Sequence, residues 1–132
     1  MQPPTTNMRY FINTRNGLRI IELDEVVYLK ADGNYTSFYY ADGKVRTELS
    51  CLSVFDAKIA NLYDRAGQNS PFYRMGRSYL INTQHISAIN FQTLLLSFRQ
   101  EDVKPITSTK NILKDLRDYL VERYDAGGYI DQ

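Results

Sequence analysis

Hydrophobic and polar residues alternate in short runs over the first fifty positions, and turn-forming residues separate the runs. Residues 9–12 and 18–23 flank the stretch 14–17, where Asn16-Gly17 suits the positive φ angles of a tight turn. The chain is therefore expected to open with a β-hairpin. β-branched and aromatic residues then predict three more strands, separated by turns at Asp32-Gly33-Asn34 and Asp42-Gly43. These strands are expected at 26–31, 35–40 and 44–49.

The hydrophobic spacing becomes helical after Ser53. Apolar residues at helical intervals predict an amphipathic helix over 54–66, with Ser53 as N-cap and Gly67 as its C-terminal stop. A second helix is expected from Ser108 or Thr109 to Tyr124. Its apolar stripe comprises Ile112, Leu113, Leu116, Tyr119 and Leu120.

Strand-like composition returns between the two helices, with predicted strands at 79–81, 86–91, 94–98 and 103–106. Pro105 has no N–H to donate, so the last of these strands is expected at a sheet edge. We expect one domain over residues 9–124. Residues 1–8 are interpreted as a flexible linker or the end of an expressed segment, and residues 125–132 as a loose C-terminal tail.

Composition limits the chain to one ordinary core, because 132 residues with 43% apolar content can hardly bury two. Sixteen basic and fifteen acidic residues give a net charge of +1, so total charge does not favour nucleic acid as a partner. The charge is nevertheless sorted along the chain. The interval from Arg65 to Gln100 contains four arginines and His85 but no Asp or Glu.

A single cysteine, Cys51, cannot form an internal disulfide, and no apolar run approaches the ~20 residues that a membrane span requires. The start of the chain lacks the basic and apolar regions of a signal peptide. We therefore expect a cytoplasmic protein without a membrane segment.

An enzyme is not expected, because nucleophilic or metal chemistry needs Cys, His and carboxylate groups brought together and the chain has one Cys and one His. We accordingly expect no catalytic residue, no metal site and no cofactor. Cys51 is interpreted as a small buried hydrophobe rather than a reactive thiol. His85 is interpreted as a hydrogen-bonded turn histidine rather than a catalytic or metal-binding one. Gly33, Gly43 and Gly76 fall at turns, which explains them without a bound nucleotide.

The function class that remains is recognition of a binding partner, and three loops are candidate binding sites. Asn34, in the first loop, can read a base edge or simply form the turn, and composition favours the turn. The second loop is 74–77. Its Arg77 can reach guanine or phosphate, or it can be an ordinary solvated arginine, and the residues alone favour neither interpretation. The third is 107–111, where a helix N-terminus offers free N–H groups to a phosphate. Lys110 in that first turn costs a few tenths of a kcal/mol against the helix dipole, which suggests an anionic partner without requiring one.

The chain resembles the LytTR family of bacterial DNA-binding domains, which are found in transcription regulators. The resemblance lies in the residues and the order of three segments, 23–35, 72–82 and 86–89. The resemblance runs from about Phe11 to Tyr124. Family members usually carry His-Arg-Ser-Tyr or His-Arg-Ser-Phe and then Val-Asn in the central segment. Here Gly76 replaces the histidine and Ile81 the valine, while Arg77 and Ser78 keep the pattern. The loss of the histidine puts in doubt any contact that it makes in relatives.

The resemblance implies a mainly β fold, an elongated arrangement of about ten short strands in small antiparallel sheets with two flanking α-helices. It also implies that inter-strand loops read the major grooves of double-stranded DNA. The candidate DNA-binding residues are Asn34, Tyr35, Thr36, Arg74, Arg77, Ser78, Lys110, Asn111 and Lys114.

Relatives commonly bind paired direct repeats in promoters as homodimers, and serve as output domains of two-component response regulators. A receiver or sensor domain is therefore expected in the full-length protein, outside this chain. Two other hypotheses stay open. One is a protein-protein interaction module that uses a tyrosine-rich β surface, and the other is a binder of single-stranded RNA or DNA through exposed aromatic rings.

Overall fold

The computed structural model describes residues 8–124. The predicted linker up to residue 7 and the predicted tail at 125–132 lie outside this range. Met8, which the sequence assigned to the linker, is only 6% exposed and packs in the core.

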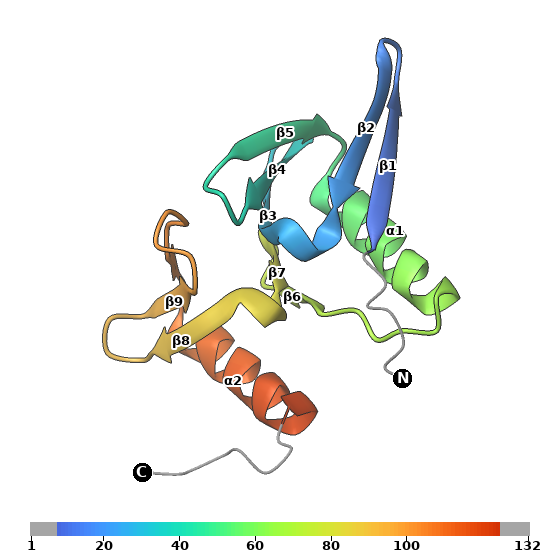
Figure 1. Cartoon of the computed structure of the whole chain (residues 1–132). Helices are drawn as coiled ribbons and strands as arrows, with labels where there is room; N and C mark the ends of the chain where they lie inside the picture. Colours follow the sequence, from blue (N-terminus) through green and yellow to red (C-terminus); the bar gives the residue numbers. More distant parts are fainter. Residues whose placement is uncertain (1–7, 125–132) are drawn as a thin grey trace.

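The described residues form ten strands in three small antiparallel sheets, with two α-helices, so the predicted mainly β fold is confirmed (Figure 1). The two-stranded sheet is the predicted hairpin, β1 (Arg9–Thr14) with β2 (Gly17–Glu22). The five-stranded sheet has the order β5-β4-β3-β7-β6. Its strands are β3 (Val26–Asp32), β4 (Tyr35–Tyr40), β5 (Val45–Leu49), β6 (Phe72–Met75) and β7 (Tyr79–Asn82). The three-stranded sheet comprises β8 (Ile86–Asn90), β9 (Leu95–Phe98) and β10 (Ile106–Thr107).

Strand β3 lies at the centre of the five-stranded sheet, and its residues Val26, Val27, Tyr28 and Leu29 are all buried. Val26 and Leu29 belong to one hydrophobic core, whereas Val27 and Tyr28 belong to a second. A register shift between Val26 and Tyr28 interrupts the strict alternation of faces. One strand thus forms part of both cores, and the expectation of a single core is wrong.

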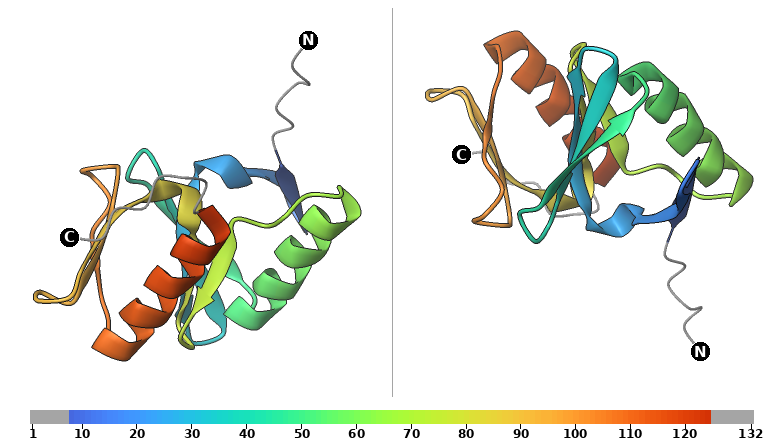
Figure 2. Two further views of the ribbon diagram at one scale, coloured as in Figure 1. Left: turned by 90° about the horizontal axis from the view of Figure 1, so that it is seen from below. Right: turned by 90° about the horizontal axis from the view of Figure 1, so that it is seen from above.

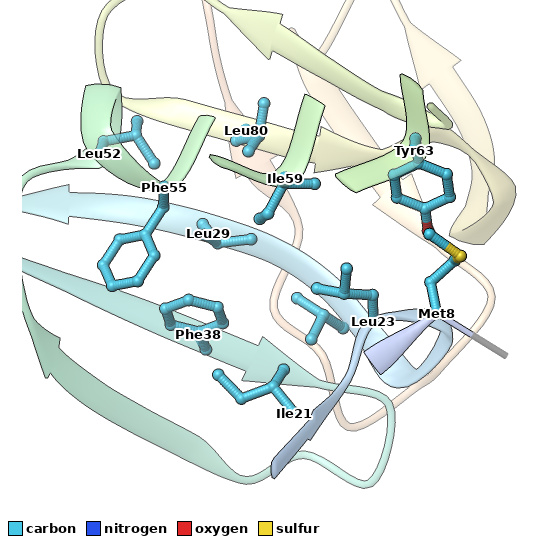
Figure 3. Close-up of a cluster of buried hydrophobic side chains, with 11 residues drawn as sticks. Met8, Ile21, Leu23, Leu29, Phe38, Leu52, Phe55, Ile59, Tyr63 and Leu80 are labelled. Carbon is cyan, nitrogen blue, oxygen red and sulfur yellow. The ribbon is translucent and has the colours of Figure 1, made fainter. Parts of the chain in front are cut away.

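The first core lies between the five-stranded sheet and α1 (Leu52–Arg65). The Phe55 ring of the helix meets the Phe38 ring of β4 edge to face, with centroids 5.0 Å apart. Ile59 of α1 and Ile21 of β2 are buried in the same cluster, so the hairpin is anchored to it (Figure 3).

The second core lies on the opposite face, beneath the three-stranded sheet and α2 (Lys110–Tyr124). Leu113 and Leu116 of α2 are completely buried there. The Tyr28 ring of β3 stacks on Phe98 of β9 with centroids 5.3 Å apart. The five-stranded sheet therefore separates the two helices (Figure 2).

The sequence did not predict strand β6, and it misplaced β10. No strand was expected at 72–75, yet these residues pair with β7 from Phe72↔Asn82 to Met75↔Tyr79. The predicted strand 103–106 is shorter and later, because Val103 is buried in a turn and Pro105 cannot join a ladder. The predicted edge position of this strand is confirmed.

The first helix begins at Leu52, with Cys51 in the N-cap position, so the predicted Ser53 cap is wrong. Its predicted stop is confirmed, because Gly67 adopts φ +68° and donates its N–H to the carbonyl of Asp64 at 3.0 Å. In the opening hairpin the turn residues are Arg15 and Asn16, since Gly17 already pairs with Thr14. The positive φ expected at Asn16 is not found.

Candidate nucleic-acid interface

Two turns lie side by side at one end of the five-stranded sheet. Strand β3 leads into the first, where Asp32 pairs with Tyr35 across Gly33 and Asn34. The second, at 76–78, joins β6 to β7. The two turns are neighbours because the N–H of Ala31 donates to the carbonyl of Ser78 at 2.8 Å.

Both helices begin at this same end (Figure 2). A Cβ atom on Gly76 would lie 3.6 Å from Cδ1 of Ile112, so the 76–78 turn touches the first turn of α2. Thr109 caps that helix, because its Oγ1 accepts the N–H of Ile112 at 3.3 Å. We call the two turns, at 33–35 and 76–78, together with the first turns of α1 and α2, the turn face.

The turn face carries exposed positive charge. Arg77 and Lys110 on this face, and Lys114 one turn further along α2, are exposed, and none forms an ion pair with an acidic side chain of residues 8–124. The helix N-termini add partial positive charge through N–H groups that lack a partner within the helix. This combination favours an anionic ligand.

Lys30 adds a further cation that the sequence analysis missed. It lies three residues before Gly33 of the first turn, is exposed, and pairs across the sheet with Tyr79 at the start of β7. The signal that could have revealed this cation is a lysine directly after the apolar run 26–29. From the sequence alone Lys30 was expected only as part of the strand 26–31, because the sequence does not show which turns lie beside that strand.

Arg74 does not lie in a loop as predicted; it lies on β6 and is engaged within the protein. Its Nη1 donates to Oδ2 of Asp56 at 3.2 Å, and its Nη2 donates to the carbonyl of Arg77 at 3.0 Å. Its charge is therefore partly compensated. The side chain connects α1 to the 76–78 turn, so its geometry suits it to hold Arg77 in place.

The remaining predicted residues divide by exposure. Asn34, Ser78 and Asn111 are exposed, and Tyr35 is 49% exposed. Thr36 is completely buried, and its hydroxyl donates to the carbonyl of Ser50 at 2.8 Å. The predicted set is corrected by removing Thr36, because a buried side chain cannot reach a ligand at the surface.

Gly76 occupies the family histidine position with φ +61°, in the left-handed region. Any side chain there is strained, although ordinary van der Waals contact with Ile112 leaves space for a Cβ atom. The glycine thus shapes the turn that presents Arg77.

The interpretation of Cys51 as a buried hydrophobe is wrong, because the residue is exposed at the start of α1. The neighbouring Leu52, 2% exposed, fills the core position instead. The prediction that His85 is a hydrogen-bonded histidine is confirmed. Its Nε2–H donates to the carbonyl of Asp24 at 2.7 Å, and its Nδ1 accepts from the amide of Gln100 at 2.8 Å.

Among residues 8–124, no group of three or more His, Cys, Asp or Glu side chains is placed to hold a metal ion. No helix in the same range is long and apolar enough to cross a membrane.

A family model described as the LytTr DNA-binding domain matches residues 16–121. Among solved structures, the fold resembles the LytTr DNA-binding domain of a protein described as a methyl-accepting/DNA response regulator from Bacillus cereus, with a TM-score of 0.60. The two sequences are 19% identical, and the alignment covers 88% of this chain and 98% of that chain. No curated protein matches the chain.

Proposed function

The chain belongs to the LytTR family of DNA-binding domains, and from this premise we propose that it reads duplex DNA selectively through its turn face. One observation carries this proposal. Arg77 and Lys110 are exposed and form no ion pair with residues 8–124. They lie close together, because the 76–78 turn between β6 and β7 lies against the first turn of α2.

In this proposal Arg77 and Lys110 enter the major groove or meet its flanking phosphates. An arginine fork donates in parallel to O6 and N7 of guanine, a contact worth roughly 1 to 3 kcal/mol of discrimination. Asn34 lies on the neighbouring turn, where its amide can reach a base edge. Lys30 and Lys114 supply attraction to phosphate that does not depend on sequence.

Ser78, Asn111 and Tyr35 complete the proposed contact set, because their exposed side chains lie on the same turn face. Hydroxyl and amide groups commonly bind phosphate oxygens and fix the register of a protein on DNA. Thr36 has no place in this set because of its burial.

We further propose that residues 9–124 act as one domain, the output domain of a bacterial response regulator controlled by a receiver or sensor domain elsewhere. The similar Bacillus cereus structure, whose parent protein is described as a response regulator, supports this role. Binding to paired direct repeats in promoters, as a homodimer, is part of the same proposal.

The alternative, protein binding through a tyrosine-rich β surface, is less well supported. Tyr28 is 4% exposed and stacks on Tyr39 with ring centroids 4.3 Å apart. Tyr79 packs edge-on against the same ring. These tyrosines fill the second core and leave little ring surface for a partner.

Fluorescence anisotropy of labelled duplex from the promoter of the gene's own operon tests the proposal. Arg77→Ala and Lys110→Ala should each weaken binding about 5- to 150-fold, the equivalent of roughly 1 to 3 kcal/mol. Wild-type affinity should fall steeply between two salt concentrations, because bound phosphates release counterions. Arg15→Ala, a cation at the hairpin turn, is the control that should bind like wild type.

The opposite result is equally clear. If wild type binds the promoter no better than random duplex and neither variant matters, the turn face does not read DNA. The protein-interaction alternative then becomes the leading hypothesis.

A further inference from the structure

A second charged surface lies on the outer side of α1. Lys58, Asn61, Leu62 and Arg65 recur at intervals of three and four residues, so they share one stripe of the helix. With the β1 residues Arg9, Tyr10 and Phe11 they line a groove of about 340 Å³. We call these seven residues the basic groove.

The basic groove has three cations and no acidic side chain in its lining. Lys58 and Arg65 form no ion pair with any acidic side chain of residues 8–124, whereas Arg9 is held by Glu22 at 2.8 Å. Phe11, 55% exposed, adds an apolar wall. The groove therefore suits an acidic surface with some apolar area.

The chain itself carries a matching surface on α2. Asp115, Asp118 and Glu122 are exposed and lie at i, i+3 and i+7, so they form an acidic stripe. Asp118 pairs with its neighbour Arg117 at 2.8 Å, while Asp115 and Glu122 form no ion pair within residues 8–124. Carboxylates repel phosphate, so this stripe is not expected to face DNA.

The charged side chains on the two surfaces have the same spacing along their helices. Asp115 and Glu122 are seven residues apart, as are Lys58 and Arg65, so each pair spans two helical turns, or about 10.5 Å. Two helices laid side by side can therefore place both carboxylates against both cations. The partners cannot meet within one chain, because α1 and α2 cover opposite faces of the five-stranded sheet (Figure 2).

We propose that the acidic stripe of one copy docks in the basic groove of a second copy, head to tail. The contact is heterologous, since it joins two different surfaces. It leaves the turn face of each copy free, because the α1 residues of the groove start at Lys58, six residues after the beginning of the helix, and the stripe starts five residues after the beginning of α2. Exposed ion pairs contribute little individually and are screened by salt, so the association is weak and strongest at low ionic strength.

Sedimentation velocity of the whole chain over a range of concentrations tests this contact without DNA. Wild type should shift from monomer to larger species as concentration rises at low salt, and should return to monomer at high salt. The groove variant, Lys58→Glu with Arg65→Glu, should stay monomeric. The stripe variant, Asp115→Lys with Glu122→Lys, should also stay monomeric.

Mixing the two variants gives the decisive measurement. Each variant carries like charges on both surfaces and repels itself, but an equimolar mixture restores opposite charges at every contact. The mixture should therefore associate as wild type does. The control for the groove variant is Arg15→Glu with Lys104→Glu. It changes the net charge by the same amount as the groove variant, at exposed positions outside the groove, and should associate like wild type.

Three results would overturn the proposal. The first is a wild type that remains monomeric at low salt at every concentration. The second is association that persists in either variant alone, and the third is a mixture of two folded variants that stays monomeric. Thermal unfolding followed by circular dichroism establishes that each variant is folded. Since DNA is absent, none of these results bears on the DNA-binding proposal.

Discussion

Arg74 donates from Nη2 to the backbone carbonyl of Arg77 at 3.0 Å, so one arginine holds the turn that presents another. The same guanidinium reaches Asp56 on α1 at 3.2 Å. A fork with two donors is what allows this bridge, and an ammonium group of similar charge cannot reproduce its fixed geometry. The orientation of Arg77 therefore depends on a helix behind the turn.

Arg74→Lys is predicted to lower DNA affinity roughly fivefold, about the 1 kcal/mol of one lost hydrogen bond. The substitution keeps the positive charge but not the bridge between Asp56 and the turn. Titration of labelled duplex by anisotropy measures the change. Equal affinity for Arg74→Lys and wild type, with weaker binding by Arg74→Gln, would show instead that only the charge of Arg74 matters.

Gly76→Ala is predicted to lower the free energy of unfolding by about 1 kcal/mol, because φ +61° is unfavourable for a residue with a Cβ atom. Gly76→Asn should cost less, since asparagine tolerates the left-handed region. Urea unfolding followed by circular dichroism measures both.

Gly67→Ala is the matched control for this change. Gly67 has φ +68° and nothing within 4 Å of its Cβ position, but it follows the far end of α1. Both alanine variants should lose similar stability, while only Gly76→Ala should also weaken DNA binding. Equal DNA affinity in the two would separate the shape of the 76–78 turn from DNA recognition.

Cys51 is predicted to react with a thiol reagent in the folded protein and to be protected by bound DNA. The residue is exposed at the start of α1, on the end of the molecule that forms the turn face. Labelling followed by mass spectrometry measures the rate with and without duplex, and high salt should abolish the protection by releasing the DNA. An unchanged rate at saturating duplex would place the start of α1 outside the interface.

Alkaline solution is predicted to destabilise the fold through Tyr63. Its ring is 3% exposed, its hydroxyl has no hydrogen-bond partner among residues 8–124, and burial raises its pKa to about 12. Below about pH 10 the side chain is neutral in both states, so its contribution to stability is complete there. Above that pH the unfolded chain ionises first, and up to roughly 2 to 3 kcal/mol is lost as pH approaches 12.

Tyr63→Phe should remove this part of the loss and should cost little at neutral pH, because it deletes an unpaired hydroxyl. Tyr28, whose pKa burial also raises, leaves a remaining alkaline loss in the variant. Urea unfolding at several pH values measures the difference. Parallel curves for Tyr63→Phe and wild type would contradict the assignment to Tyr63.

The strands and helices could be predicted from sequence wherever period and turn residues agree. The helices at 52–65 and 110–124 and the strands from 26 to 49 follow their apolar patterns closely. Strand β6 was missed because its four residues lack alternation in the sequence, and pairing with β7 creates the strand. The cap at Cys51 was missed because a side chain that makes no capping bond leaves no sequence signal.

The candidate site could be predicted as three separate loops but not as one surface. Arg77 stood out as a candidate for guanine or phosphate, and Lys110 as a cation in the first turn of a helix, yet the sequence did not place them together. Contact between Gly76 and Ile112 brings the two loops to one end of the sheet. The roles of Arg74 and Thr36 were beyond prediction for the same reason, since Asp56 and Ser50 reach them only through the tertiary fold.

The burial of β3 on both faces has a consequence for how the domain comes apart. Because Val26 and Leu29 line one core while Val27 and Tyr28 line the other, neither core can open without exposing this strand to water. We therefore expect the amide protons of β3 to exchange with solvent only when the whole domain unfolds. A pulling force that detaches either helix also exposes β3, so the domain should unfold in one cooperative step and not one core at a time.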